Sequence, residues 1–331
     1  MAMVSLGLPF VDPDLESRVR SKLLDVEAAL GAAVASDNEF IDAAAHHLLD
    51  AGGKRFRPLL VVLASEFGDP DSPAVIPSAV VVELTHLATL YHDDVMDEAD
   101  LRRGAQSANA RWTNSIAILT GDFLFAQASA IVADLGPDAV RIQARTFSRL
   151  VQGQIRETVG PDAADDPLAH YLAVVADKTG SLIATSARFG ARLSGTSRDV
   201  EETLTAYGEQ IGTAFQLSDD IIDVASDSAD LGKTPGTDLR EGVLTLPSLM
   251  ARRSTQAADE RLLDLLSGPI RSDDEHAEAL GLLRSSPAME LAREEVQRRA
   301  DAARALLDSL PDIPAREALV ALCDLVTTRT S

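Results

Sequence analysis

Two clusters of three aspartates, spaced in the same way, constrain this chain more than any other feature of its sequence. The first cluster is Asp93, Asp94 and Asp97, and the second is Asp219, Asp220 and Asp223. Each lies in, or at the end of, an apolar stretch of helix-compatible residues. An α-helix turns by about 100° per residue, so the first and last aspartates of a cluster share one face. The sequence therefore predicts two helices, each carrying a pair of aligned carboxylates.

Each cluster requires a positive partner, because neighbouring carboxylates repel one another. Mg²⁺ prefers oxygen ligands and is usually held by one or two carboxylates together with substrate phosphates. For the first cluster alone, a solvated acidic helix end with Arg102 and Arg103 as countercharge is the simpler interpretation. The second copy reverses that preference, because two such helices facing each other across a cavity could hold several Mg²⁺ ions around one diphosphate.

The composition favours helices packed on helices. Hydrophobic residues make up 46% of the chain and aromatic residues only 4%, so the core must consist mostly of Ala, Leu, Val and Ile. Glycine and proline bound most of the periodic segments, and no domain linker or internal repeat is visible. The segments predicted to be helical are residues 13–34, 38–51, 80–97, 116–135, 137–160, 167–190, 288–310 and 314–328. We expect an all-α fold with residues 1–331 in a single domain.

Charge and cysteine usage exclude several classes of partner. The formal net charge of −22 argues against nucleic acid and against an anionic membrane surface. No run of 18 apolar residues occurs, so no transmembrane segment is predicted, and Met1–Phe10 lacks the features of a secretion signal. The single cysteine, Cys323, fits a reducing cytoplasm and is expected to be a core residue of the last helix. A phosphate substrate would have to be bound by local cations and metal.

Four further segments are candidates for chemistry but decide little by themselves. Gly53–Pro58 places three cations at the start of a helix, which alone indicates basic residues flanking that start. His86 lies two turns before the first aspartate cluster, and a lone histidine on an apolar helix is more often a core residue. Lys178–Gly180 interrupts a helix and predicts a kink. The polar segment Asp227–Gly242 contains Gly-Lys-Thr but lacks the first glycine of a P-loop.

Taken together, these motifs resemble those of the trans-isoprenyl diphosphate synthases, the polyprenyl synthetases. The matching segments, in family order, are Gly52–Pro58, His86, Asp93–Gly104, Lys178–Thr179, Phe215–Asp223 and Gly232–Gly242. The resemblance implies a bundle of antiparallel helices around a central apolar cavity, with the six aspartates holding three Mg²⁺ ions per active site. It also implies that isopentenyl diphosphate is bound by Lys54, Arg57, His86 and Arg103. By the same resemblance, the allylic diphosphate is bound by Arg102, Lys178 and Lys233, and Thr179 and Gln216 present oxygen dipoles to the reacting cation.

The resemblance further implies the reaction and the assembly. The allylic diphosphate ionises, the double bond of isopentenyl diphosphate attacks the cation, and a proton is lost to the departing diphosphate. The family implies a homodimer in which the first helices contribute to the contact. Val243 departs from the pattern, because the family commonly has a lysine at this position, so one expected phosphate contact is missing.

Product length is expected to depend on the cavity below the first aspartate cluster. Ala88, five residues before Asp93, is small, and the resemblance implies that bulk at this position stops elongation near C15 to C20. We therefore hypothesise a C30 to C50 all-trans product, of the kind used for quinone side chains, with Phe147 as an alternative floor. A short-chain synthase, a class I terpene cyclase and the catalytic subunit of a two-component synthase remain alternatives. A cyclase would normally carry an Asn/Asp-Ser/Thr-Glu motif in place of the second aspartate cluster.

Overall fold

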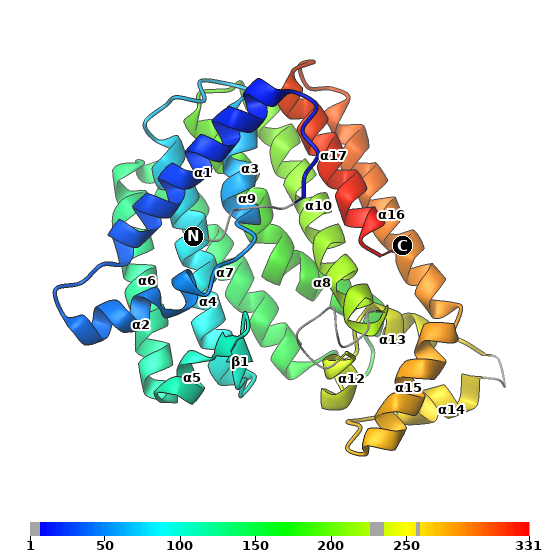
Figure 1. Cartoon of the computed structure of the whole chain (residues 1–331). Coiled ribbons are helices and arrows are strands. Elements are labelled where there is room, and N and C mark those ends of the chain that lie inside the picture. The colour runs from blue at the N-terminus through cyan, green and yellow to red at the C-terminus, as the bar shows by residue number, and fades with distance from the viewer. Residues whose placement is uncertain (1–6, 226–234, 256–258, 331) are drawn as a thin grey trace. The chain divides into compact units, whose positions relative to one another are not determined.

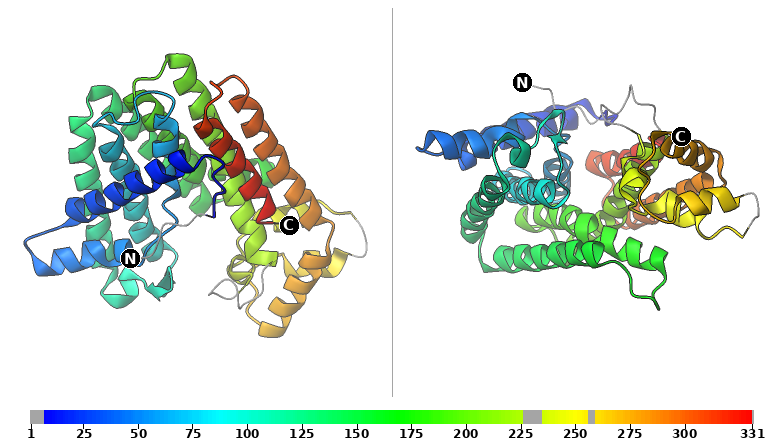
Figure 2. Two further views of the ribbon diagram at one scale, coloured as in Figure 1. Left: turned by 45° about the horizontal axis from the view of Figure 1, so that its top comes forward. Right: turned by 90° about the horizontal axis from the view of Figure 1, so that it is seen from below.

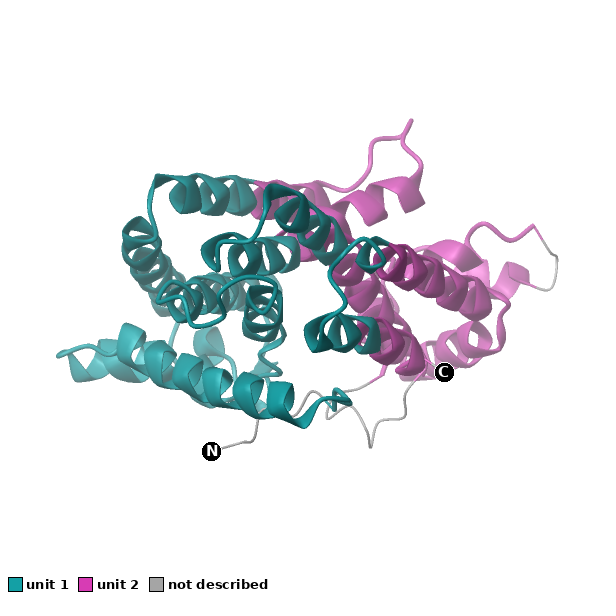
Figure 3. Cartoon of the chain, turned by 90° about the horizontal axis from the view of Figure 1, so that it is seen from above, with its two compact units in different colours: residues 1–148, 182–208, 306–321 teal, residues 149–181, 209–305, 322–331 magenta. Residues whose placement is uncertain are grey.

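The regular structure of the described residues is helical apart from one short hairpin, which confirms the predicted all-α class (Figure 1). The computed structural model describes residues 7–225, 235–255 and 259–330. Within these ranges the chain forms two compact units (Figure 3). Unit 1 comprises residues 1–148, 182–208 and 306–321, and unit 2 comprises residues 149–181, 209–305 and 322–331. The single-domain organisation stays a prediction.

Most helices lie entirely within one of the two units, and the others have residues in both. Unit 1 contains α1 (Pro13–Val34), α2 (Glu39–Asp50), α3 (Phe56–Ser65), α4 (Val75–Met96), β1 (Leu101–Arg102), β2 (Ala105–Gln106), α5 (Ala108–Arg111) and α6 (Asn114–Asp134). Unit 2 contains α8 (Pro167–Val175), the π-helical turn η1 (Ala176–Gly180), α12 (Thr237–Glu241), α13 (Leu246–Ala251), α14 (Glu260–Leu265) and α15 (Asp273–Ser285). The helices with residues in both units are α7 (Pro137–Val159), α9 (Ser181–Leu193), α10 (Arg198–Ala225), α16 (Ala288–Leu307) and α17 (Pro314–Thr328).

Side-chain caps set several helix starts. Asp166 accepts a hydrogen bond from the Leu168 amide and caps α8. Ser272 accepts from the Glu275 amide at the start of α15, in the pattern of a capping box. Such residues satisfy amides that have no partner inside the helix. The local sequence therefore determines these boundaries without help from tertiary contacts.

The core of unit 1 is built around α4. This helix packs against α6, α3 and α1, and α1 runs obliquely across α3 and α4 (Figure 2). The backbones of α9 and α3 come into direct contact at Gly190, where an added Cβ would lie 2.1 Å from the Val61 carbonyl oxygen. Only glycine permits that approach. The Tyr91 hydroxyl on α4 donates to the Ala44 carbonyl on α2 at 2.6 Å, which ties α2 to the helix that carries the first aspartate cluster.

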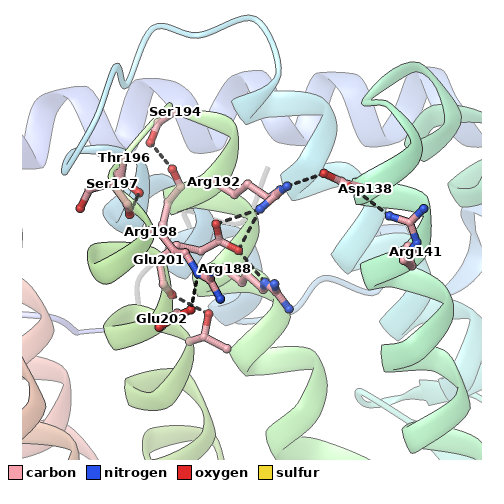
Figure 4. A network of polar contacts seen from close by, with 12 residues as sticks. Asp138, Arg141, Arg188, Arg192, Ser194, Thr196, Ser197, Arg198, Glu201 and Glu202 are labelled. Carbon is pink, nitrogen blue, oxygen red and sulfur yellow. Dashed lines mark hydrogen bonds and ion pairs between the residues drawn. The ribbon is translucent and has the colours of Figure 1, made fainter.

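A network of ion pairs fixes the turn between α9 and α10 within unit 1 (Figure 4). Glu201 is buried and accepts hydrogen bonds from Arg188 at 2.8 Å and from Arg192 at 3.0 Å. Arg192 also reaches Asp138 at the start of α7, at 2.6 Å. A buried carboxylate needs such partners to offset its lost hydration. The network therefore holds together the ends of three helices.

Two segments differ from the sequence prediction. Residues 101–106, which no predicted helix covers, form a hairpin in which β1 pairs with β2 through a turn at Arg103 and Gly104. Both turn residues have positive φ, 55° and 75°, as two-residue hairpin turns require. Residues 237–241 of the segment predicted to be a polar loop form the short helix α12. The predicted phosphate ligand Lys233 lies outside the described residues.

Among the described residues one helix, α6, is long and apolar enough by length and composition to cross a membrane, although polar residues interrupt its apolar runs. Only 33% of its most apolar window is buried. Its exposed apolar residues include Ile118 and Leu119, which are 42% and 62% exposed. Cys323, by contrast, is fully buried on α17, as predicted.

Candidate functional site

The first aspartate cluster lies at the C-terminal end of α4, as the sequence predicted. Asp93 and Asp94 belong to its last turn, and the Asp97 amide closes the helix by donating to the Asp93 carbonyl at 2.8 Å. The side chain of Asp97 is 51% exposed, whereas that of Asp94 is fully buried. Arg102, on β1, donates to Asp94 at 2.5 Å and lies 3.9 Å from Asp97. The hairpin therefore positions Arg102 as a countercharge for two of the three aspartates.

Asp94 has one carboxylate oxygen that is available to bind a cation. Burial raises the pKa of its carboxyl group, while the Arg102 charge acts in the opposite direction. Its second oxygen, Oδ2, is buried and has no hydrogen-bond partner among the described residues. Among all the residues that the structure describes, no three His, Cys, Asp or Glu side chains lie close enough to hold a metal by themselves. A cation here would need further ligands from substrate or water, which is how Mg²⁺ is usually bound.

Arg57, Arg103 and His86 form a half-buried basic cluster in the same unit. Burial and the charge of Arg103 lower the pKa of Arg57 to about 10. Burial, together with Arg57 and Arg103, also lowers the pKa of His86 well below its usual range. The pKa of Arg103 is lowered by burial and by nearby arginines, although Glu83 opposes this. Three of the four residues predicted to bind isopentenyl diphosphate are therefore brought together, as two arginines that favour the neutral form of the histidine beside them.

Neighbouring acids offset this cluster only in part. Glu83 raises the pKa of Arg57 and Arg103, but it is also paired with Arg55 at 3.1 Å. The Nε atom of Arg57 is buried without a hydrogen-bond partner among the described residues. Lys54, the fourth predicted ligand, is exposed at the surface of the same loop. Arg55, in the same motif, is turned inward and pairs with Glu27 and Glu83, which the sequence did not reveal.

The second aspartate cluster lies on α10 in unit 2. Asp219 has a 39% exposed side chain, and Arg329, from the end of the chain, donates to its Oδ1 at 2.5 Å. The guanidinium of Arg329 also stacks 4.7 Å from the ring centroid of Phe215, a cation–π contact. Asp223 is buried one turn later on the same helix. The predicted one-turn spacing is therefore confirmed, and each cluster is described within its own unit.

Asp220 is the hub of a hydrogen-bond chain. Its Oδ1 accepts from Gln216 at 3.0 Å, and its Oδ2 accepts from the Tyr171 hydroxyl. Gln216 in turn accepts from Thr179 at 3.2 Å. Burial raises the pKa of Asp220 to about 7, although the hydrogen bonds from Tyr171 and Gln216 act in the opposite direction. The two residues predicted to face the reacting cation, Thr179 and Gln216, therefore contact each other and one of the aspartates.

Lys178 and Thr179 lie on the π-helical turn η1, which is the kink that the sequence predicted. π-Helical turns are frequently found at functional sites. Lys178 pairs with Glu157 at 2.6 Å. The turn is anchored by Asp177, which accepts from Arg149 at 2.9 Å and pairs with Arg156 at 2.6 Å. These contacts set the position of the lysine that the resemblance assigns to the allylic diphosphate.

Three side chains that contact the predicted site residues carried no signal in the sequence. Tyr171 and Glu157 lie in ordinary helical stretches and Arg329 follows the end of α17, and no spacing rule relates them to the aspartates. His92, next to Asp93, also contacts another helix, since its Nε2 lies 3.1 Å from the Ile118 carbonyl on α6. Tertiary packing alone creates these contacts.

A cavity of about 730 Å³ lies elsewhere in unit 1. It is bordered by the ion-pair network at the turn between α9 and α10 and contains none of the predicted site residues (Figure 4). Its arginines are engaged with Glu201, Glu202 and Asp138. The charged side chains that line this cavity therefore already serve as partners in the ion-pair network.

Comparison with known proteins identifies the family. The model of the polyprenyl synthetase family matches residues 38–283. A nonaprenyl diphosphate synthase of Mycobacterium tuberculosis strain H37Rv is 49% identical over 99% of this chain and 98% of its own length. A geranylgeranyl pyrophosphate synthase from Corynebacterium glutamicum, solved with calcium and isoprenyl diphosphate, is 47% identical, with a TM-score of 0.88 over 97% of this chain and 99% of its own. A decaprenyl diphosphate synthase from Rhodobacter capsulatus is 31% identical, with a TM-score of 0.86 over 96% of this chain and 99% of its own. The aspartate clusters, the basic cluster and these similarities lead to one conclusion: this chain belongs to the polyprenyl synthetase family and is a polyprenyl diphosphate synthase, a prenyltransferase.

Proposed function

We propose that this enzyme condenses an allylic diphosphate with isopentenyl diphosphate, repeatedly, to a C30 to C50 all-trans polyprenyl diphosphate. The observation that carries the proposal is the half-buried basic cluster of Arg57, His86 and Arg103. Arg103 lowers the pKa of Arg57, and both arginines favour the neutral form of His86, while Glu83, which offsets these arginine charges in part, is also paired with Arg55. A bound anion would remove the repulsion between the arginines. A diphosphate suits it, because guanidinium groups bind phosphate through paired N–H donors.

The first aspartate cluster fits a divalent cation. The donor set is made of carboxylate oxygens, and the buried Oδ2 of Asp94 has no hydrogen-bond partner among the residues described. We propose that both aspartate clusters hold Mg²⁺, with three ions per active site once a diphosphate is bound. Bound Mg²⁺ would stabilise the negative charge that develops on the leaving diphosphate. This arrangement requires the two clusters to face each other, which is part of the proposal.

The chain's own residues would orient the allylic substrate and protect its cation. Lys178 would exchange Glu157 for the allylic diphosphate, assisted by Arg102 and by Lys233, which lies outside the described residues. Thr179 donates its proton to Gln216, so its oxygen lone pairs remain available to face the cation. The carbonyl oxygen of Gln216 is already accepting that proton. We therefore assign the stabilising dipole chiefly to Thr179, with Gln216 holding it in place.

Product length would be set by the packing around Ala88. This residue is fully buried on α4, and its carbonyl oxygen would lie 3.1 Å from a Cβ added at Gly121. Farther along unit 1, Phe125 and Phe147 form an aromatic pair with centroids 4.4 Å apart. A small residue at position 88 leaves room for a growing chain, and the aromatic pair is the candidate floor. These features support a medium or long product, for which quinone side chains are the proposed use.

We also propose that the enzyme is a cytoplasmic homodimer in which a second copy covers α6. The apolar surface of this helix, including Ile118 and Leu119, is too exposed for an isolated subunit. A second copy would bury it without requiring a membrane. Sedimentation of the purified protein tests this: a dimer is expected, and Leu119→Glu should shift it toward monomer. A monomeric wild type, or binding of the wild type to neutral lipid vesicles, would argue against this assembly.

Incubation of the purified chain with Mg²⁺, labelled isopentenyl diphosphate and farnesyl diphosphate tests the reaction. We expect polyprenyl products of 30 to 50 carbons, which disappear in Asp93→Asn and Asp219→Asn. Asp274→Asn, at the capped start of α15, is the matched control and should retain activity. Products of only 15 to 20 carbons would indicate a short-chain synthase. Cyclic hydrocarbons formed from the allylic substrate alone would indicate a cyclase, and activity only with an added partner would indicate a two-component synthase.

A further inference from the structure

Tyr171 contacts the second aspartate cluster, and this contact has no place in the reaction described so far. It lies on α8, one turn before the π-helical turn η1, and its hydroxyl donates to Oδ2 of Asp220 on α10. Asp220 is only 6% exposed. Its other oxygen accepts from Gln216 at 3.0 Å. Both oxygens of this carboxylate are therefore engaged by donors from the chain itself.

The orientation of the Gln216 amide orders this chain of contacts. Its NH₂ group is turned toward Asp220, whose carboxylate oxygen accepts from it. Its carbonyl oxygen then faces Thr179, whose hydroxyl donates to it at 3.2 Å. The order is Tyr171 to Asp220, Gln216 to Asp220, and Thr179 to Gln216. These three hydrogen bonds link α8, η1 and α10 within unit 2.

This geometry separates the roles of the three aspartates on α10. Asp219 is 39% exposed on its side chain and is reached by Arg329. Asp220 is buried and held by two donors, so its rotation about its own side-chain bonds is fixed. A carboxylate fixed in this way is better suited to hold its helix and its neighbours in place than to change partners when metal binds.

We propose that Tyr171 is a positioning residue that acts through Asp220 to fix the second aspartate cluster and Thr179 for the allylic substrate. The inference rests on the proposed function, and it adds a residue that touches neither substrate nor metal. Without the hydroxyl, Asp220 loses one of its two donors and can rotate away from Gln216. The order of the chain from Asp220 to Thr179 would then be lost. The isopentenyl diphosphate site of unit 1 uses other residues and should not be affected.

Tyr171→Phe removes the hydroxyl and keeps the ring. We expect the KM for the allylic diphosphate and the Mg²⁺ concentration for half-maximal rate to rise by about 10-fold or more, the usual scale for a hydrogen bond to a charged group. The KM for isopentenyl diphosphate should stay within about twofold of the wild type, because its cluster of cations is intact. This split between two substrates is a readout that a general loss of stability would not produce.

Tyr207→Phe is the matched control. Tyr207 is fully buried, and its hydroxyl donates to the Leu319 backbone carbonyl at 2.8 Å, with no aspartate involved. This variant should lower the melting temperature without changing either KM. Circular dichroism establishes that both variants are folded before kinetics are measured. If Tyr171→Phe fails to fold while Tyr207→Phe folds, the role of Tyr171 is structural and the proposal is overturned.

A double-variant cycle tests whether Tyr171 acts through Asp220. Asp220→Asn combined with Tyr171→Phe should be no worse than Asp220→Asn alone, because the two changes break the same contact. Losses that multiply would overturn the proposal. An inactive wild type would refute the proposed function itself. An active wild type in which Tyr171→Phe behaves like Tyr207→Phe would refute only this inference.

Discussion

Gly153 on α7 offers the sharpest test of how the π-helical turn positions its lysine and threonine. A Cβ added at Gly153 would lie 2.8 Å from the Lys178 amide nitrogen and 3.1 Å from the Asp177 Cβ. Real Cβ atoms essentially never come closer than 3.0 Å to such neighbours. The first neighbour is backbone, so it cannot swing aside. Gly153→Ala must therefore move η1 away from α7.

The displacement follows from these distances. Ordinary contact begins at 3.4 Å, so the 2.8 Å approach must open by the difference, 0.6 Å. Overpacking of this kind destabilises the folded state by about 1–3 kcal/mol. The higher helix propensity of Ala offsets about 0.5–1 kcal/mol of that loss. The ion pairs of Asp177 with Arg149 and Arg156 resist the movement. A misplacement of about 1 Å can cost about 100-fold in rate, so we expect a loss of about 10- to 100-fold.

Gly281→Ala is the matched control, because Gly281 is also helical, on α15, and an added Cβ there meets nothing within 4 Å. It should gain about 0.5–1 kcal/mol in stability with unchanged activity. Initial rates of isopentenyl incorporation and denaturant midpoints compare the two variants. If Gly153→Ala is as stable and as active as Gly281→Ala, the close approach of α7 to η1 does not control the position of Lys178, and the reasoning is refuted.

Three further predictions concern unit 1. Ala88→Phe should shorten the product toward C15 to C20, measured by chromatography of labelled polyprenols; an unchanged length would mean that the floor lies elsewhere, with Phe147 the next candidate. His86 has a pKa well below the usual 6.5, so below about pH 6.5 the unfolded chain binds a proton that the folded chain resists, and folding stability should fall as the pH falls. His86→Gln should reduce that fall between pH 6.5 and 5 in denaturation experiments, and an identical pH profile would contradict the assignment. Arg55→Met should destabilise the fold by about 3–5 kcal/mol, because it leaves Glu83 buried at 2% exposure without its partner; a change below about 1 kcal/mol would show that Arg57 or Arg103 replaces it.

Local sequence determined the helices and the placement of the acids. The spacing within each aspartate cluster follows from the turn of the helix, and the caps at Asp166 and Ser272 depend on contacts within three residues. The kink at Lys178 was also readable, because glycine interrupts a helix there. These features are properties of a short stretch of chain, so they need no knowledge of what packs against it.

Tertiary structure alone decided which charged groups pair. The sequence offered Arg55 and Arg57 as equivalent cations, yet Arg55 turns inward to Glu83 while Arg57 remains in the cluster with His86. It gave no reason to connect Tyr171 to Asp220, or Arg329 to Asp219 across 110 residues of chain. Such pairings depend on the depth of burial and the direction of each side chain after the helices have packed, because desolvation makes an unpaired buried charge costly. The physical cause is therefore the low polarity of the packed interior, which no local pattern of residues encodes.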